Sequence, residues 1–231
     1  QPDGAAGLVS YGLLNLAHRD GLDRPAPVAP GQWMTVRVQL DDIAQRFPAG
    51  HRIRIAVTTQ FWPMVWPAPD AATISLSTGD SVLDLPVRLS GPLDDGEPPF
   101  ATAAMPPPPA ITWLRPVKRE RTIERDVVSG RVTRRYLKDD GAYRIEEHGM
   151  ELDSCATQRY WVDGEDPLSA GAELTFRVEH RRGAWRAAID SRMEATCTAD
   201  HFLVRGSWRA FEGDTEVFSR DIDETIARTF V

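Results

Sequence analysis

The chain has little of several residues and patterns that mark common classes of protein. Only two of its 231 residues are cysteine, Cys155 and Cys197, and neither belongs to a Cys-x-x-Cys pair, so no disulfide framework is expected. Lysine is almost absent, since 25 of the 27 basic residues are arginine, and the net charge is −7. An acidic chain with evenly spread charge offers no basic face to nucleic acid or to anionic lipid. No apolar run approaches the roughly 20 residues of a membrane-spanning helix, so neither nucleic acid nor a membrane is an expected partner.

Catalytic patterns are scarce as well. Serine hydrolases of the elbow type carry a Gly-x-Ser-x-Gly motif, whereas residues 79–83 read Gly-Asp-Ser-Val-Leu, with Leu83 where the second small residue belongs. The five histidines follow no metal-ligand spacing, and nothing positive in the sequence supports a cluster of His180, His201 and Cys197. Glycine-rich phosphate loops are absent too. The sequence therefore predicts no catalytic residue, no metal site and no cofactor.

What the chain does have is the pattern of β-strands. Pro48 and Gly50 favour a chain reversal, and the residues that follow alternate, with Ile53, Ile55 and Val57 on one predicted face. Such alternation is typical of half-buried strands. Five segments before residue 90 are predicted as strands: 8–14, 34–40, 53–59, 73–77 and 82–89.

A proline-rich stretch divides the chain. Seven of the eighteen prolines lie between residues 90 and 110, and the stretch ends in four consecutive prolines, residues 106–109. Consecutive prolines favour an extended polyproline II spacer, although such a run can also serve as a ligand for an aromatic groove. We therefore expect one domain in residues 1–90, a linker in residues 91–110 and a second unit in residues 111–231.

The second unit also follows a β pattern, with longer segments. Ser129 and Gly130 favour a two-residue hairpin turn between strands 121–128 and 131–138, and Asp139-Asp140-Gly141 is expected to be the next turn. Further predicted strands cover residues 173–180, 185–189, 201–211 and 215–219. Turns are expected at residues 182–184 and 212–214, around Gly183 and Gly213. Near the end, the four-residue spacing of Ile222, Ile226 and Phe230 would suit a short helix. The predicted fold class is all-β and mainly antiparallel.

One segment combines aromatic mass with irregular backbone, namely residues 61–67, Phe-Trp-Pro-Met-Val-Trp-Pro. Side chains as large as tryptophan are seldom left in water without a role. Three interpretations are open: the loop covers the core of its own domain, stacks on a sugar ring, or docks against another domain.

Three groups of residues carry a resemblance to a known family. The first is Pro2-Asp3-Gly4 with residues 11–16 and His18-Arg19-Asp20; the second is Pro30-Gly31, residues 36–40 and residues 47–55; the third is the 61–67 loop with residues 83–87. Together they resemble the C-terminal region of the cocaine esterase and X-Pro dipeptidyl-peptidase family of α/β-hydrolases. The resemblance covers residues 1 to about 90. Residues 111–231 are similar to a β-rich extension of some longer members, through residues 166–170, 182–185 and 217–220.

The resemblance implies a jelly-roll β-sandwich that follows a hydrolase domain, in which the whole Ser, Asp and His triad lies. This chain is then expected to be a fragment that lacks the triad and the first strands of the sandwich, with exposed strand edges. The expected partner is the α/β-hydrolase domain of the parent serine hydrolase, and the domain-interface candidates are Phe61, Trp62 and Trp66.

Two other functions are open. A free-standing β-sandwich module that binds carbohydrate or peptide would present Trp62 and Trp66 coplanar and facing solvent, whereas a docking loop would pack them into an irregular apolar patch. A metal-dependent β-barrel enzyme would need three of the five histidines to converge.

Overall fold

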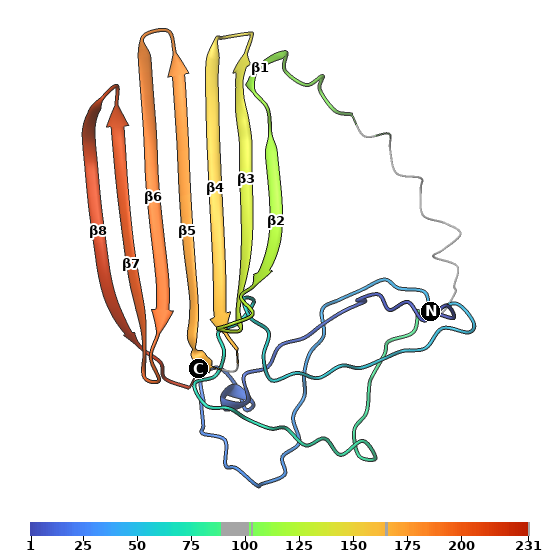
Figure 1. Ribbon diagram of the computed structural model, residues 1–231. Coiled ribbons are helices and arrows are strands. Elements are labelled where there is room, and N and C mark those ends of the chain that lie inside the picture. Colours follow the sequence, from blue (N-terminus) through green and yellow to red (C-terminus); the bar gives the residue numbers. More distant parts are fainter. Residues whose placement is uncertain (89–101, 103, 165, 231) are drawn as a thin grey trace.

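The computed structural model describes residues 1–88, 102, 104–164 and 166–230. The all-β class is confirmed, because eight antiparallel strands form one open sheet (Figure 1). Within these ranges the one helical element is the three-residue 3₁₀ turn η1 (Leu16–His18), and no helix is long and apolar enough to cross a membrane. The strands are β1 (Ile111–Arg115), β2 (Lys118–Arg125), β3 (Arg131–Ile145), β4 (Met150–Asp163), β5 (Asp166–Arg182), β6 (Trp185–Cys197), β7 (His201–Glu212) and β8 (Thr215–Ala227).

The sheet is a meander of consecutive hairpins. From β3 to β8 each strand pairs with the next along the chain, while β1 and β2 pair in tandem with the two halves of β3. The β5–β6 and β7–β8 connections are two residues long and begin with Gly183 and Gly213, both at φ 58°. Such tight turns require a positive φ, which glycine adopts without a steric cost. The turns predicted at these two positions are confirmed.

Two predicted turns differ from the structure. The turn between β2 and β3 spans residues 126–130 rather than two residues, because the Asp126 carboxylate accepts hydrogen bonds from the amides of Val128 and Ser129 and so organises a longer loop. The predicted turn at Asp139-Asp140-Gly141 is instead a bulge inside β3, where the register shifts between Asp139 and Gly141. The Gly141 amide donates to Asp139 Oδ1 at 2.8 Å. The same aspartate and glycine chemistry serves both turns and bulges.

Two other expectations on secondary structure were wrong or incomplete. The short helix suggested by Ile222, Ile226 and Phe230 does not form, since Ile222 and Ile226 lie in β8 and Phe230 follows that strand without regular secondary structure. A four-residue spacing is a multiple of the two-residue strand period, so it places these side chains on one face of a strand equally well. The β4 strand was not predicted, because its charged, small and aromatic residues do not alternate strictly.

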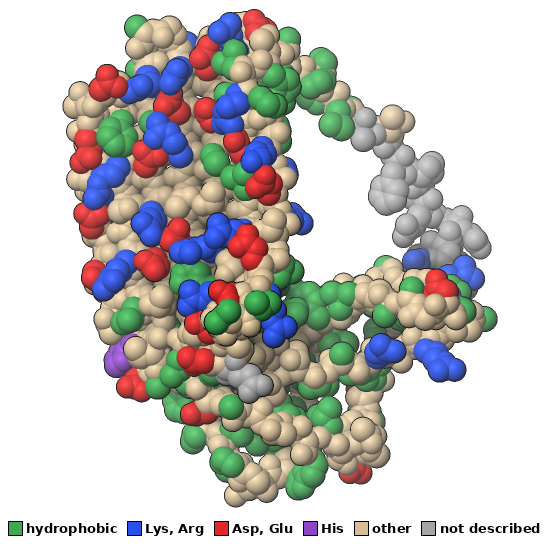
Figure 2. Space-filling view, viewed as in Figure 1, with side chains coloured by type: hydrophobic (Ala, Val, Ile, Leu, Met, Phe, Trp, Pro, Cys, Tyr) green, Lys and Arg blue, Asp and Glu red, His purple; other side chains and the backbone are tan. Residues whose placement is uncertain are grey.

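The two faces of the sheet differ chemically, because successive residues of a strand point to opposite sides. One side of the sheet holds the even-numbered residues of β4 and β5 and the residues paired with them, and we call it the apolar face. Its large side chains include Trp113, Tyr143, Leu152, Tyr160, Phe176, Val178, Ile189, Met193, Phe202 and Trp208. The other side, the charged face, holds Asp139, Asp153, Arg159, Glu173, Arg177, Glu179, Asp190, Arg192, Arg205 and Arg209. Intermixed basic and acidic side chains cover the strands in Figure 2.

Residues 1–88 contain no strand, so the individual strands predicted before residue 90 are not present in the described structure. These residues run as extended segments beside the ends of the strands (Figure 1). Ile53, Ile55 and Val57 are each more than half exposed. One backbone hydrogen bond, from Asp41 N to Tyr11 O at 2.9 Å, joins the residue after predicted strand 34–40 to the middle of predicted strand 8–14. Alternating side chains alone cannot form a strand, since the backbone groups also need a continuous row of partners.

The predicted linker falls mostly outside the described residues. Of residues 91–110, the structure describes residue 102 and residues 104–110, which have no regular secondary structure. The β1 strand begins immediately afterwards, at Ile111.

Candidate functional site

The aromatic loop at residues 61–67 folds into a tight turn. The amides of Met64 and Val65 both donate to the carbonyl of Phe61, at 2.8 and 3.2 Å, and the Trp62–Pro63 peptide bond is cis. This turn brings the rings of Trp62 and Trp66 to a centroid distance of 4.7 Å at an interplanar angle of 49°. The structure therefore brings two of the three predicted interface residues together. The third, Phe61, turns instead toward Tyr11, with ring centroids 6.1 Å apart.

Both tryptophans contact the apolar face of the sheet. The Trp62 ring meets Tyr160 of β4 edge to face at 6.0 Å, and the Trp66 ring lies 5.2 Å from Phe202 of β7. Aromatic pairs prefer such tilted arrangements. The loop thus covers one end of the sheet, where β4 ends and β7 begins.

Arg228, just after β8, ties the loop to the same end of the sheet. Its guanidinium donates to the carbonyl of Pro67 at 2.6 Å and to that of Thr198 at 3.1 Å, and it lies 4.8 Å from the centre of the Phe202 ring. Charged hydrogen bonds of this kind are stronger than neutral ones. We call the set Trp62, Trp66, Pro67, Tyr160, Phe202 and Arg228 the loop–sheet junction.

Sequence reasoning missed Arg228, and no local signal marks it among 25 arginines. A second long-range contact lies nearby, where the Asn15 side-chain amide donates to the carbonyl of Phe230 at 2.5 Å. Asn15 also caps η1, since its side-chain oxygen accepts from the amide of Ala17 at 2.9 Å. The junction is therefore supported by hydrogen bonds from two separate parts of residues 1–88.

The environment of the junction is largely apolar. Burial raises the pKa of Tyr160, and the neighbouring Tyr136 adds to this effect while Arg134 opposes it. Burial also raises the pKa of the Cys197 thiol, whose Sγ lies 3.7 Å from the carbonyl of Leu168. Both groups thus stay protonated near neutral pH, and the thiol is not activated as a nucleophile. Trp62 Nε1 is buried without a hydrogen-bond partner.

The geometry bears on the interpretations of the aromatic loop. A platform for a sugar ring needs a coplanar, solvent-facing pair, whereas Trp62 and Trp66 are tilted against each other and are each partly covered. Their outer contacts are side chains of the sheet. The pair forms a packed irregular patch, which is the arrangement expected of a docking loop, and its contact in this structure is with residues 111–231 of the same chain.

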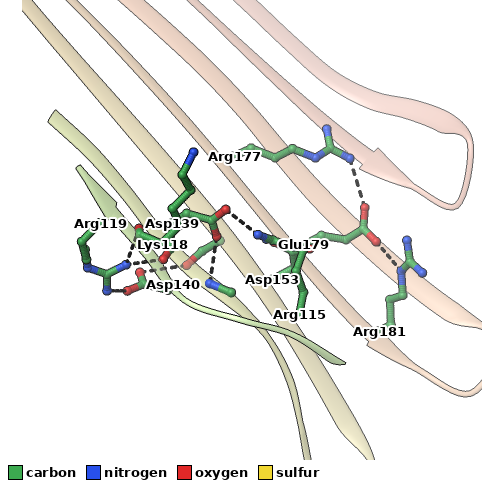
Figure 3. A network of polar contacts seen from close by, with 11 residues as sticks. Arg115, Lys118, Arg119, Asp139, Asp140, Asp153, Arg177, Glu179 and Arg181 are labelled. Carbon is green, nitrogen blue, oxygen red and sulfur yellow. Dashed lines mark hydrogen bonds and ion pairs between the residues drawn. The ribbon is translucent and has the colours of Figure 1, made fainter. Parts of the chain in front are cut away.

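The charged face holds a network of ion pairs rather than free catalytic groups (Figure 3). Arg115 joins Asp139 and Asp153, the latter at 2.6 Å. The hydrogen bond from Arg115 holds the pKa of Asp139 below its usual value, although burial opposes it. Burial alone would raise the pKa of Glu179, but the hydrogen bonds and charges of Arg181 and Arg177 outweigh it and lower that pKa. Such carboxylates remain ionised and paired, so they suit a structural role better than proton transfer.

The other residues considered in the sequence lie apart. The Ser81 hydroxyl donates to the carbonyl of Ser77 at 2.7 Å. His180 lies opposite Ala187, whereas Cys197 and His201 lie at the other end of the sheet, so the cluster considered from the sequence does not form. Both cysteines are free. Within the described part of the chain no three His, Cys, Asp or Glu side chains are grouped to hold a metal ion.

Comparison with known proteins identifies the first part of the chain. Residues 1–98 match the family model of the X-Pro dipeptidyl-peptidase C-terminal non-catalytic domain. Searches of the curated proteins and of the solved structures found no match. The resemblance inferred from the sequence for residues 1 to about 90 is therefore confirmed.

Proposed function

From the match of residues 1–98 to the X-Pro dipeptidyl-peptidase C-terminal non-catalytic domain, we propose that this chain is an accessory region of a serine hydrolase. The parent enzyme cleaves ester or X-Pro amide bonds, and its catalytic Ser, Asp and His lie in an α/β-hydrolase domain. The accessory region supports that domain and helps to form the wall of its substrate cleft. The match to a non-catalytic domain is the observation that carries the proposal.

The chemistry of the chain supports a structural role. The serine of the incomplete motif, Ser81, hydrogen-bonds a backbone carbonyl, whereas a serine nucleophile needs a histidine base within hydrogen-bond reach. Asp139 and Glu179 are ionised and held by arginines. The tryptophans of the aromatic loop are used in packing. Each of these groups stabilises the fold, so the catalytic step is assigned to another domain.

Activity assays test the proposal directly. The purified chain is incubated with a nitrophenyl ester and with an X-Pro anilide, and no turnover is expected above that of buffer. A matched Ser81→Ala variant serves as the control for contamination. Turnover by the unmodified chain that disappears in the Ser81→Ala variant would mean that the chain holds its own nucleophile, and the proposal would be wrong.

Reconstitution tests the supporting role. The hydrolase domain of the same gene product is made as a separate polypeptide and assayed alone and with this chain. Because binding to a folded state stabilises it, the added chain is expected to lengthen the half-life of hydrolase activity on heating and to raise kcat/KM. Unchanged half-life and unchanged kcat/KM would contradict the supporting role.

A further inference from the structure

The arginines of the sheet are all paired with carboxylates on the charged face, whereas most of those on the apolar face are unpaired. Every arginine of the charged face has a carboxylate partner: these are Arg115, Arg131, Arg135, Arg144, Arg159, Arg177, Arg181, Arg186, Arg192, Arg205 and Arg209. On the apolar face Arg119 joins Asp140, but five others have no partner among the described carboxylates: Arg121, Arg125, Arg134, Arg182 and Arg220. Each arginine of the charged face is thus neutralised by a carboxylate, whereas the apolar face holds five arginines that no described carboxylate neutralises.

Three of these unpaired arginines lie together on β2 and β3. Arg121 and Arg134 both stack near the ring of Tyr136, at 5.9 and 5.5 Å, and Arg125 follows on the same face of β2. Arg134 Nε is buried and makes no hydrogen bond. A guanidinium offers five donors and normally uses several of them. This arginine cluster, Arg121, Arg125 and Arg134, is therefore suited to meet carboxylates that the described residues do not supply.

The apolar face next to the cluster is exposed. Phe176 and Ile189, at the centre of the sheet on β5 and β6, are 44% and 47% exposed, and Met193, Phe218 and Ile226 are similar. Large side chains on a central strand are usually covered by a second layer. The loop–sheet junction covers only the end of the face near Tyr160 and Phe202. Among the described residues, no element covers the rest of the face, which continues from that junction.

The face is large enough for a stable protein interface. Six inter-strand spacings of about 4.8 Å and strands of about 13 residues at about 3.4 Å each give a face on the order of 1,200 Å². A standard interface buries about 800 Å² on each partner. Exposed apolar patches larger than a few hundred Å² mark interaction sites.

The observations favour a separate protein domain over other occupants. A small ligand would need a concave pocket, and two hollows of the structure, lined by residues 113–117 and by residues within 57–76, lie away from the centre of the face. Basic side chains outnumber acidic ones on this face, where Glu212 and Glu224 lie on β7 and β8, so two copies packed face to face would bring excess positive charge together. Trp, Tyr and Arg side chains, which this face carries at Trp208, Tyr136 and Arg134, are enriched where protein partners bind tightly.

We propose that the apolar face of the sheet is the docking surface of a protein domain whose own surface has an apolar centre bordered by carboxylates next to the arginine cluster. This inference rests on the proposed function, under which that domain is the α/β-hydrolase domain. The loop–sheet junction then closes one end of the apolar face, and the hydrolase domain covers the rest of it.

Two pairs of neighbouring positions test the docking surface. Phe176→Glu places a charge at the centre of the apolar face, and Thr175→Glu places the same charge on the opposite face of the same strand. Arg134→Glu reverses a charge of the cluster, and Arg135→Glu reverses one on the charged face. Affinity of each variant for the separately produced hydrolase domain is measured by calorimetry, and circular dichroism checks that each variant is folded.

The expected result is a loss of affinity of about 30-fold or more for Phe176→Glu and about 10-fold or more for Arg134→Glu, which correspond to about 2 and about 1.4 kcal/mol. Losses of this size are typical of residues at the centre of an interface. Thr175→Glu and Arg135→Glu should change the affinity less than about 3-fold. If the wild-type chain binds but all four variants bind equally well, the docking surface is wrong while the proposed function stands. If the wild-type chain does not bind the hydrolase domain, the proposed function fails and this inference fails with it.

Discussion

Residues 1–88 and residues 111–227 carry the same kind of side-chain pattern but differ in what their backbones do. Both alternate apolar and polar residues, as in 53–57 and in 174–178. In the second region each alternating segment pairs over its length with the next one in the sequence. In the first region a single backbone hydrogen bond joins Tyr11, in the middle of segment 8–14, to Asp41, the residue after segment 34–40. The two regions therefore differ in whether a neighbouring segment is available for backbone hydrogen bonds, not in their side-chain pattern.

Tight turns explain why the second region has a neighbouring segment to pair with. Gly183 and Gly213 reverse the chain within two residues, so each new strand lies beside the previous one at a small loss of loop-closure entropy. In residues 1–88 the segments that meet, near Tyr11 and Asp41, are thirty positions apart. Distant segments must be held in place by other parts of a domain before their backbones can pair. A β pattern is therefore necessary for a sheet, and nearby partners make it sufficient.

Hydrogen exchange gives the largest expected contrast between the two regions. Amides in the centre of β4, β5 and β6 should exchange about 1,000-fold more slowly, or slower still, than those of residues 53–57, because the former open only with the whole sheet. Mass spectrometry of peptides after timed exchange in deuterated buffer measures the difference. Edge strand β8 serves as the internal reference, with intermediate protection. Equal protection of residues 53–57 and β5 would mean that the backbone of the first region is paired in solution. The difference in backbone pairing between the two regions would then be wrong.

A glycine inside the sheet gives the next largest effect. Gly171 of β5 lies opposite Trp161 of β4, and the indole covers it so closely that an added Cβ would lie 2.8 Å from Nε1 and closer still to Cζ2. The Trp161 ring also lies under the guanidinium of Arg159, at 4.7 Å. Gly171→Ala should therefore displace the ring and lower the free energy of unfolding by about 1–3 kcal/mol. Urea denaturation monitored by circular dichroism measures it.

The sign of the effect should reverse when the indole is removed. In a Trp161→Ala background, Gly171→Ala is expected to stabilise the sheet by about 0.5–1 kcal/mol, since glycine in a strand interior is entropically unfavourable. The same destabilisation in both backgrounds would show that the backbone at Gly171, rather than contact with Trp161, requires glycine. The difference between the two backgrounds measures cross-strand packing in the sheet, which residues 1–88 lack because they form no strand.

The sequence predicted more of the sheet than of the junction. Strands such as 201–211 and the turns at Gly183 and Gly213 depend on local alternation and on glycine, which are legible in the sequence. The bulge at Asp139 was misread as a turn because bulges and turns use the same residues. The role of Arg228 was not predictable, since its partner Pro67 is 161 positions away. The aromatic mass of the 61–67 loop did indicate a contact, but its partners, Tyr160 and Phe202, are set by tertiary structure.

The pH dependence of stability gives the smallest effect and tests the charged face. The pKa of Asp139 is lowered in the folded state by its hydrogen bond from Arg115, whereas an unfolded aspartate has a pKa of about 3.9. Its contribution to stability is therefore complete above about pH 4 and is lost as the pH falls through the lower folded value. Asp139→Asn should lower the free energy of unfolding at neutral pH by about 1 kcal/mol and make it depend less on pH below about 4. Urea midpoints measured between about pH 5 and pH 2 test this.

Glu124→Gln, at an exposed pair with Arg135 3.5 Å apart, is the matched control and should have almost no effect at neutral pH. Equal effects of the two substitutions would mean that the ion pairs of the sheet contribute only as surface charges, and that its stability comes from backbone pairing and apolar packing alone.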